Sequence, residues 1–110
     1  MKLELTTWQR LMLDRIVGGM EGNVDTIYKA SKVLDAVRMT EGELEAVKMR
    51  REGDLLRWDD AERRWEVEIA DGALADWLTA TVRAFRGWPV AEAPQVFDLL
   101  QRLGVEVEAL

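Results

Sequence analysis

Helical periodicity dominates the pattern of apolar and polar positions along the chain. In five segments, apolar residues recur every three or four positions, as they do along the buried face of an amphipathic helix. Each segment follows residues that suit a helix start, because Thr, Asn and Asp side chains accept hydrogen bonds from free N–H groups and proline is tolerated in the first turn. The predicted helices begin at Thr6-Thr7, Asn23, Thr40, Asp71 and Ala93-Pro94. Glycines predict the ends of the first, fourth and fifth helices, at Gly18-Gly19, Gly87 and Gly104.

The period shortens to two between the third and fourth predicted helices. Apolar and charged residues alternate over 47–51, 56–58 and 65–69, which is typical of strands with one packed and one wet face. Glu52-Gly53-Asp54 and the polar stretch 59–63 supply the turns. We therefore expect a small three-stranded antiparallel meander, although 47–51 could instead extend the third helix. The alternation over 105–108 predicts an edge strand or a frayed end.

The order of these elements predicts an α+β fold with three N-terminal helices, a small three-stranded antiparallel meander and two C-terminal helices. Hydrophobic residues make up 48% of the chain and include five tryptophans, enough for a packed core. No repeat, low-complexity tract or long linker divides the 110 residues. We expect residues 1–110 to form a single domain.

The chain contains neither cysteine nor histidine. Disulfides, thiolate zinc sites and cysteine nucleophiles are therefore excluded. Without histidine, the chain also lacks the usual general base near neutral pH and the commonest transition-metal ligand. We expect a protein that is not an enzyme, holds no metal and uses no cofactor. A small domain without disulfides is typical of the cytoplasm, which is the expected location.

The formal net charge of −6 limits the partners of the protein. Nucleic-acid binding draws much of its affinity from Lys and Arg side chains that displace counterions. An acidic chain is also repelled by anionic lipid surfaces. We therefore expect no membrane partner and consider nucleic acid an unfavoured one. The excess of acid either maintains solubility or presents negative surface to a basic partner.

Two clusters of residues invite a ligand-binding interpretation. Gly18, Gly19 and Gly22 precede the second predicted helix, where backbone N–H groups could face an anion, but Glu21 would repel a phosphate. Carboxylates around the predicted meander could offer oxygen ligands to calcium or magnesium. They lack the spacing of a calcium loop and arginines lie among them, so we expect turns and surface ion pairs instead. These carboxylates are Asp54, Asp59, Asp60 and Glu62.

Three helices followed by strands is also the order of a winged helix, in which the third helix enters the DNA major groove. Here the third predicted helix opens with Glu41, Glu43 and Glu45, which would face a polyanion. Its basic residues come later along the chain. A winged-helix-like, nucleic-acid-associated protein is therefore the third of our functional hypotheses.

Four short motifs are spread over most of the chain. They are Leu5-Thr6 with Gln9-Arg10, Gly22-Asn23 with Thr26, Glu41-Gly42-Glu43, and Glu52-Gly53-Asp54 followed by Trp58. Together they resemble small uncharacterised proteins encoded by tailed bacteriophages and prophages. The resemblance implies a viral origin and, as the location, the cytoplasm of a host cell. That group has no established activity, so the resemblance implies no reaction and no functional residue.

Aromatic and basic side chains at a strand end, where a half-exposed position is expected, and in loops are the candidate partner-binding residues. Trp58 ends a predicted strand, and Arg63 and Arg64 lie in the projecting connection that follows it. Arg86 and Trp88 lie in the loop after the fourth helix, where Trp88 could equally cover an end of the core. The other three tryptophans, Trp8, Trp65 and Trp77, are expected in the core. We expect a non-catalytic protein-interaction module acting on a host or viral protein; the alternative is a small-ligand or nucleotide-binding protein that sequesters a signal.

Overall fold

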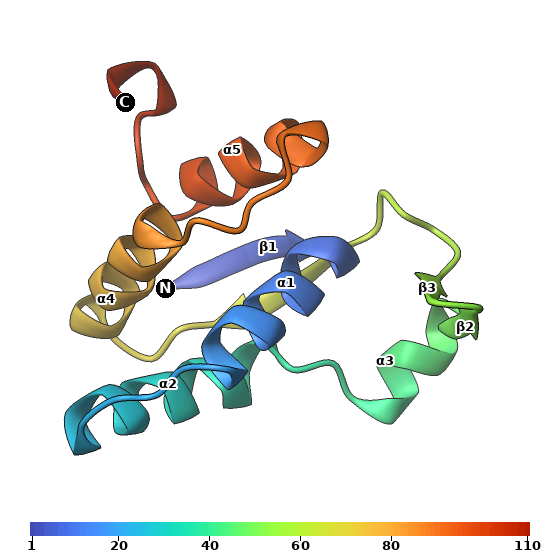
Figure 1. Cartoon of the computed structure of the whole chain (residues 1–110), viewed down its shortest axis with the longest axis horizontal. Coiled ribbons are helices and arrows are strands. Elements are labelled where there is room, and N and C mark those ends of the chain that lie inside the picture. Colours follow the sequence, from blue (N-terminus) through green and yellow to red (C-terminus); the bar gives the residue numbers. More distant parts are fainter.

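A two-stranded antiparallel sheet, formed by strands that are far apart in the sequence, lies at the centre of the computed structural model, which describes residues 1–110 (Figure 1). Strand β1 (Lys2–Thr6) pairs with β4 (Arg64–Glu68), so that Leu5 lies opposite Trp65. The apolar residues of both strands are buried, whereas the charged residues between them are exposed. Because side chains alternate between the two faces of a strand, one face of this sheet packs on the helices and the other meets water.

This pairing shows that the predicted three-stranded meander is wrong. The strand over 65–69 exists, but its partner is β1, which the helical pattern did not predict and which changes the order of elements because a strand precedes the first helix. The other two strands form a separate hairpin, β2 (Arg50–Glu52) with β3 (Leu55–Arg57). The predicted first strand begins too early because Lys48 takes a left-handed conformation with φ 52°, which no strand contains. The C-terminal alternation forms a 3-10 turn, Val107–Ala109, rather than an edge strand.

The fold contains five α-helices, and the side-chain caps of the first four are at residues that the sequence predicted. They are α1 (Thr7–Gly18), α2 (Val24–Val37), α3 (Glu41–Ala46), α4 (Gly72–Ala84) and α5 (Ala93–Arg102), and a 3-10 turn, Val90–Glu92, precedes the last. Thr6 and Thr40 form capping boxes with the residue three positions later, and Asn23 and Asp71 accept a hydrogen bond from the corresponding N–H group. These contacts are local, so the sequence alone can indicate where these helices start.

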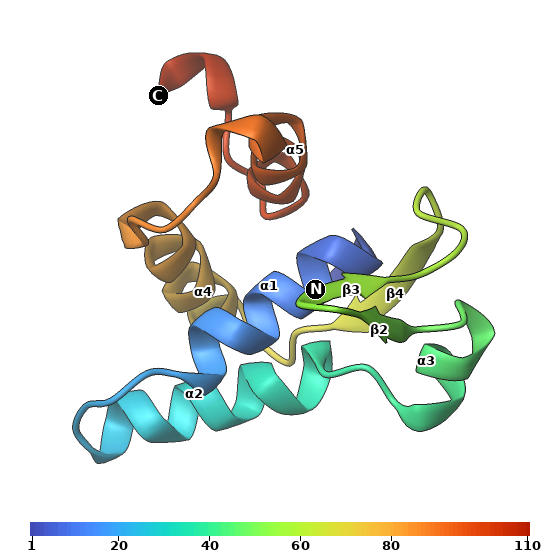
Figure 2. The same cartoon turned by 45° about the vertical axis from the view of Figure 1, so that its right-hand side comes forward.

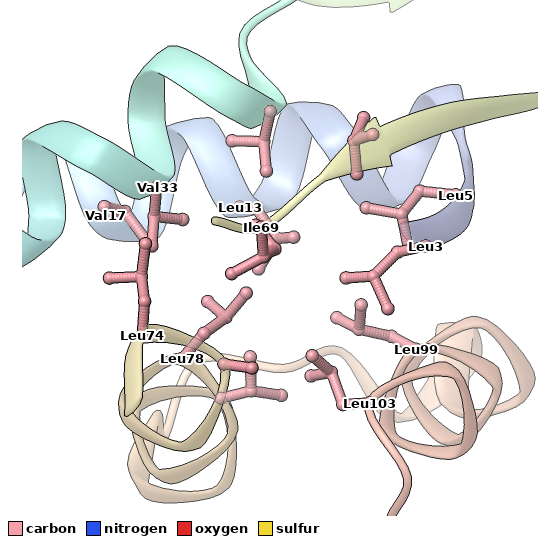
Figure 3. Close-up of a cluster of buried hydrophobic side chains, with 14 of the residues drawn as sticks. Leu3, Leu5, Leu13, Val17, Val33, Ile69, Leu74, Leu78, Leu99 and Leu103 are labelled. Carbon is pink, nitrogen blue, oxygen red and sulfur yellow. The ribbon is translucent and has the colours of Figure 1, made fainter. Parts of the chain in front are cut away.

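The main hydrophobic core lies between the inner face of the central sheet and helices α1, α2, α4 and α5 (Figure 3). Leu3 and Leu5 project from β1 towards Leu99 of α5, while Leu13 and Ile69 lie nearer α4. All five side chains are almost completely buried. The packing of four helices on one sheet face explains how a sheet of only two strands becomes stable.

Helix α3 and the β2–β3 hairpin lie on one side of the molecule, away from α4 and α5 (Figure 2). A smaller cluster of Met39, Val47 and Trp65 holds this part of the chain against the central sheet. No residue of either hairpin strand is buried. The position of the hairpin therefore depends on the contacts that the residues at its base make with the rest of the chain. None of the helices combines the length and apolar character that a membrane-spanning segment requires.

Candidate functional site

An open apolar groove of about 590 Å3 lies between α1 and the β2–β3 hairpin. Trp8, Leu11 and Met12 form its wall on α1, and Leu55, Leu56 and Trp58 form its wall on the hairpin side; Asp14, Arg15 and Asp54 complete the lining. Leu55 is 58% exposed and Leu56 is 45% exposed, which is unusual for two adjacent leucines. Large apolar side chains that converge on an open groove are typical of an interaction surface.

Helix α1 supplies this wall because its apolar residues cover more than one face. Leu13, Ile16 and Val17 point into the core and are buried. Trp8 and Met12 lie about one turn apart on a different face and are only half-buried. No residue of the main core covers this second face, so it forms the α1 wall of the groove. The sequence prediction placed Trp8 in the core, and its half-buried position corrects that prediction.

The hairpin is held opposite α1 by contacts at its base. The backbone N–H of Asp59 donates a hydrogen bond to the carbonyl oxygen of Val47 at 2.7 Å. The Nη1 of Arg50 donates two more, to the Lys48 carbonyl oxygen at 2.9 Å and to the Asp59 carboxylate at 3.2 Å. Gly53 provides the turn, with φ 63°, a conformation that glycine adopts at little cost. Trp58, at the end of the hairpin, packs on the small cluster that contains Trp65. These contacts present the leucines of β3 to the groove.

An aromatic run connects the groove with a second apolar groove beside α4. The ring of Trp8 lies 6.1 Å from that of Trp88, which lies 5.3 Å from Phe85 in an edge-to-face arrangement. Trp88 is fixed by a hydrogen bond from its indole N–H to the Val82 carbonyl at 2.9 Å. Phe85 lines the second groove, of about 410 Å3, together with Ile16, Met20, Trp77, Ala80, Thr81 and Ala84. The two grooves and the aromatic run form one apolar strip along α1, which we call the α1 strip.

A third, polar pocket of about 520 Å3 lies between β4 and the start of α5. Asp98 accepts hydrogen bonds there from Arg64 at 2.8 Å and from the buried Gln9 at 2.9 Å. Burial raises the pKa of the Asp98 carboxyl, but the hydrogen bonds from Arg64 and Gln9 outweigh it and hold the pKa below its ordinary value of 3.8. Thr6 and Gln95 also bond each other, at 3.0 Å. Four polar side chains of this pocket, those of Thr6, Arg64, Gln95 and Asp98, are thus engaged in a structural network, whereas Glu62 forms no hydrogen bond or ion pair.

The structure does not gather the five predicted partner-binding residues into one cluster. Trp58 lies in the α1 strip, and Trp88 belongs to it through Trp8. Arg63 is exposed but its guanidinium stacks 4.0 Å above the ring of Trp65, and Arg64 is tied to Asp98 and to the Glu4 carbonyl oxygen. Arg86 is exposed between Phe85 and Trp88. The basic loop and the aromatic residues therefore belong to different parts of the surface.

Sequence reasoning missed the α1 wall and the hairpin leucines. Leu11 and Met12 follow the same helical spacing as the buried residues of α1, and Leu55 lies between the predicted turn 52–54 and the predicted strand 56–58. One signal was available: α1 carries more large apolar residues than one helix face can bury. The predicted carboxylate cluster does not converge, since no three acidic side chains lie close enough to hold a metal ion, and Asp59 instead pairs with Arg50 at 3.2 Å.

Comparison of the chain with protein-family models, curated proteins and solved structures finds no match. Nothing in these comparisons links the chain to bacteriophage proteins. The geometry of the α1 strip is therefore the main basis for a functional proposal.

Proposed function

We propose that the protein is a non-catalytic protein-interaction module that docks a partner protein on the α1 strip. The observation that carries the proposal is the groove between α1 and the hairpin, where two exposed leucines of β3 and half-buried apolar side chains of α1 line one hollow. Burying such side chains is favourable by roughly 25 cal/mol per Å2 of apolar surface. Aromatic residues held by contacts with their own chain lose little conformational freedom on binding, which favours Trp58, a lining residue of the groove, as an anchor.

The proposed partner is a host or viral protein; this part of the proposal rests on the resemblance of the short motifs to small proteins of tailed bacteriophages and prophages. A cytoplasmic location agrees with a chain that has no cysteine. The alternative, a small-ligand or nucleotide-binding protein, would need polar groups free to meet a ligand. The polar pocket beside α5 does not favour it, because most of its polar side chains already bond each other and the free one, Glu62, would repel a phosphate.

A matched pair of substitutions tests the proposed function. Leu56 and Phe97 are exposed to the same degree, 45% and 44%, but only Leu56 lies in the groove. We expect Leu56→Asp to reduce capture of partner proteins from a lysate of the source cells by about tenfold or more, equivalent to ~1.4 kcal/mol. Phe97→Asp should leave capture unchanged, and both variants should melt close to the wild-type temperature. Quantitative mass spectrometry of the captured proteins is the measurement, and equal capture by all three proteins contradicts the proposal.

A further inference from the structure

The β2–β3 hairpin has few polar contacts with the rest of the molecule. No hydrogen bond or ion pair joins residues 50–57 to a residue outside 48–59. The charged side chains of the two strands pair with each other, because Glu52 meets Arg50 at 3.5 Å and Arg57 at 3.2 Å. No side chain of either strand is buried. The hairpin is therefore a unit that holds its own shape but is weakly held in place.

The attachment of the hairpin to the molecule lies at its base. Met49 comes directly before β2 and Trp58 directly after β3, and both pack on the small cluster that contains Trp65. The backbone bond from Asp59 to Val47 closes this base. A rigid unit that is joined at one end turns about the backbone positions there, and hinges commonly form at such element ends. The pivot of the hairpin therefore lies between the base and the two strands.

Apolar side chains line both sides of the groove beside this pivot. Leu55 and Leu56 line it from the hairpin, although they are 58% and 45% exposed. Trp8, Leu11 and Met12 line it from α1 and are only half-buried. The open groove of about 590 Å3 separates the two sets. Because burial of apolar surface is favourable, a turn of the hairpin towards α1 would remove both sets from water.

We propose that the hairpin is a lid with two positions, the open one of this structure and a closed one in which Leu55 and Leu56 rest on the apolar wall of α1. In the closed position the leucines of the hairpin fill the groove, and a partner cannot enter it. Closure is opposed by the loss of freedom when the tip of the hairpin becomes fixed. The two positions therefore exchange rather than one excluding the other.

The lid would control docking on the α1 strip, and this consequence rests on the proposed function. A partner that enters the open groove binds only the fraction of molecules whose lid is open, so its apparent affinity falls by that fraction. The closure itself needs no partner. It is therefore measurable on the protein alone.

Distances between pairs of spin labels test the closure, since the chain has no cysteine of its own. Arg51→Cys places a label on the hairpin, and Asp76→Cys places one on α4, which lies away from the hairpin with α1 between them (Figure 2). Both positions are exposed and free of ion pairs. We expect pulsed electron double resonance to give two distances, of which the shorter belongs to the closed lid.

The matched control places the first label on α3 instead of the hairpin. Glu45 is exposed, forms no ion pair and lies on the same side of the molecule as the hairpin (Figure 2). Glu45→Cys with Asp76→Cys should give one distance, because α3 does not belong to the lid. A single distance of the same width from the hairpin pair overturns the proposal.

Substitution of the two leucines tests whether the shorter distance comes from closure on α1. An ionised carboxylate is costly to bury against apolar side chains, so Leu55→Asp/Leu56→Asp should abolish the shorter distance in the labelled hairpin pair. The control Val90→Asp/Phe97→Asp changes two exposed apolar residues outside the groove and should leave both distances unchanged. A shorter distance that survives Leu55→Asp/Leu56→Asp overturns the proposal.

The lid and the proposed function fail in different ways. If two distances appear and depend on the leucines, but Leu56→Asp leaves capture from the lysate unchanged, the lid is confirmed and the proposed docking surface is wrong. If only one distance appears while Leu56→Asp reduces capture, the lid is wrong and the hairpin is a fixed wall of the docking surface.

Discussion

Arg10 illustrates, at the scale of a single residue, how a charged side chain becomes part of the core. Its side chain is 4% exposed, and its Nε donates to the Val37 carbonyl at 2.9 Å. Its two terminal nitrogens bond both carboxylate oxygens of Glu43, at 2.9 and 3.2 Å, and one of them also bonds the Arg38 carbonyl. Every donor that faces the interior thus has a partner, which offsets the cost of burying the charge. Through this one residue, α1 is tied to the end of α2 and the start of α3.

The first prediction concerns the pH dependence of the Arg10–Glu43 pair. The hydrogen bonds from Arg10 hold the pKa of Glu43 below its ordinary value of 4.5, against a smaller opposing effect of burial. The unfolded chain therefore binds a proton more readily than the folded one as the solution becomes acidic. The stabilisation is present above pH 4.5 and is lost as the pH falls through the lower folded-state pKa. The free energy of unfolding of the Glu43→Gln variant should therefore fall less than that of the wild type as the pH is lowered.

Urea denaturation at a series of pH values measures this effect. Glu45→Gln is the matched control, because Glu45 lies on the same helix, is exposed and forms no ion pair. We expect the free energy of unfolding of the Glu45→Gln variant to fall with acid as steeply as that of the wild type. A Glu43→Gln curve parallel to the wild-type curve would show that the pair contributes nothing to acid stability.

At the scale of secondary-structure elements, the two strand pairs, β1–β4 and β2–β3, have different roles. The β1–β4 pair joins residues 58 to 66 positions apart and carries one face of the main core. The β2–β3 pair joins neighbours through the Gly53 turn and buries nothing. The hairpin is therefore free to present Leu55 and Leu56 to a partner, while the central pair sets the stability of the fold.

A pair of leucine truncations tests this division. Leu5 in β1 is completely buried, whereas Leu55 in β3 is 58% exposed. Leu5→Ala leaves a cavity in the core and should lower the free energy of unfolding by about 2–5 kcal/mol. Leu55→Ala should change it by less than about 0.5 kcal/mol. Chemical denaturation gives both values; a large loss of stability in Leu55→Ala would mean that the hairpin is part of the cooperative core.

At the scale of the whole molecule, a charged sheet face and a mostly apolar groove are distinct surfaces. The outer face of the central sheet carries exposed side chains of both signs, and Lys2 pairs with Glu66 at 3.4 Å. The groove between α1 and the hairpin is lined mainly by apolar side chains, together with Asp14, Arg15 and Asp54. Charged side chains on the two short strands also protect the central sheet from pairing with other strands.

Binding to nucleic acid provides a test at this scale. With a net charge of −6 and with glutamates Glu41 and Glu43 in the first turn of α3, the protein should bind random-sequence DNA duplex weakly or not at all at physiological salt. Fluorescence polarisation with a labelled duplex is the measurement, with a basic DNA-binding protein as the positive control. Low-micromolar affinity that falls steeply with added salt would show a cluster of basic residues acting together and would revive the winged-helix hypothesis.

The helices could be predicted from the sequence because their signals are local. Thr6, Asn23, Thr40 and Asp71 each bond an N–H group three residues later in the chain, so the side chain and its partner appear together in the sequence. The absence of cysteine and histidine was equally plain and limited the chemistry. The half-buried position of Trp58, at the end of the second hairpin strand, also followed from its place in the pattern.

Strand pairing and the α1 strip required the tertiary structure. The alternation of Leu3 and Leu5 with charged residues was present in the sequence, but five residues do not reveal a partner that lies beyond position 63. Helical periodicity likewise shows that Trp8 and Leu13 are apolar but not which of them the core will cover. The sequence by itself determined where the helices begin and which chemistry is missing. Only the tertiary structure decided which apolar face remains exposed, because burial depends on neighbours that the chain brings together over long distances.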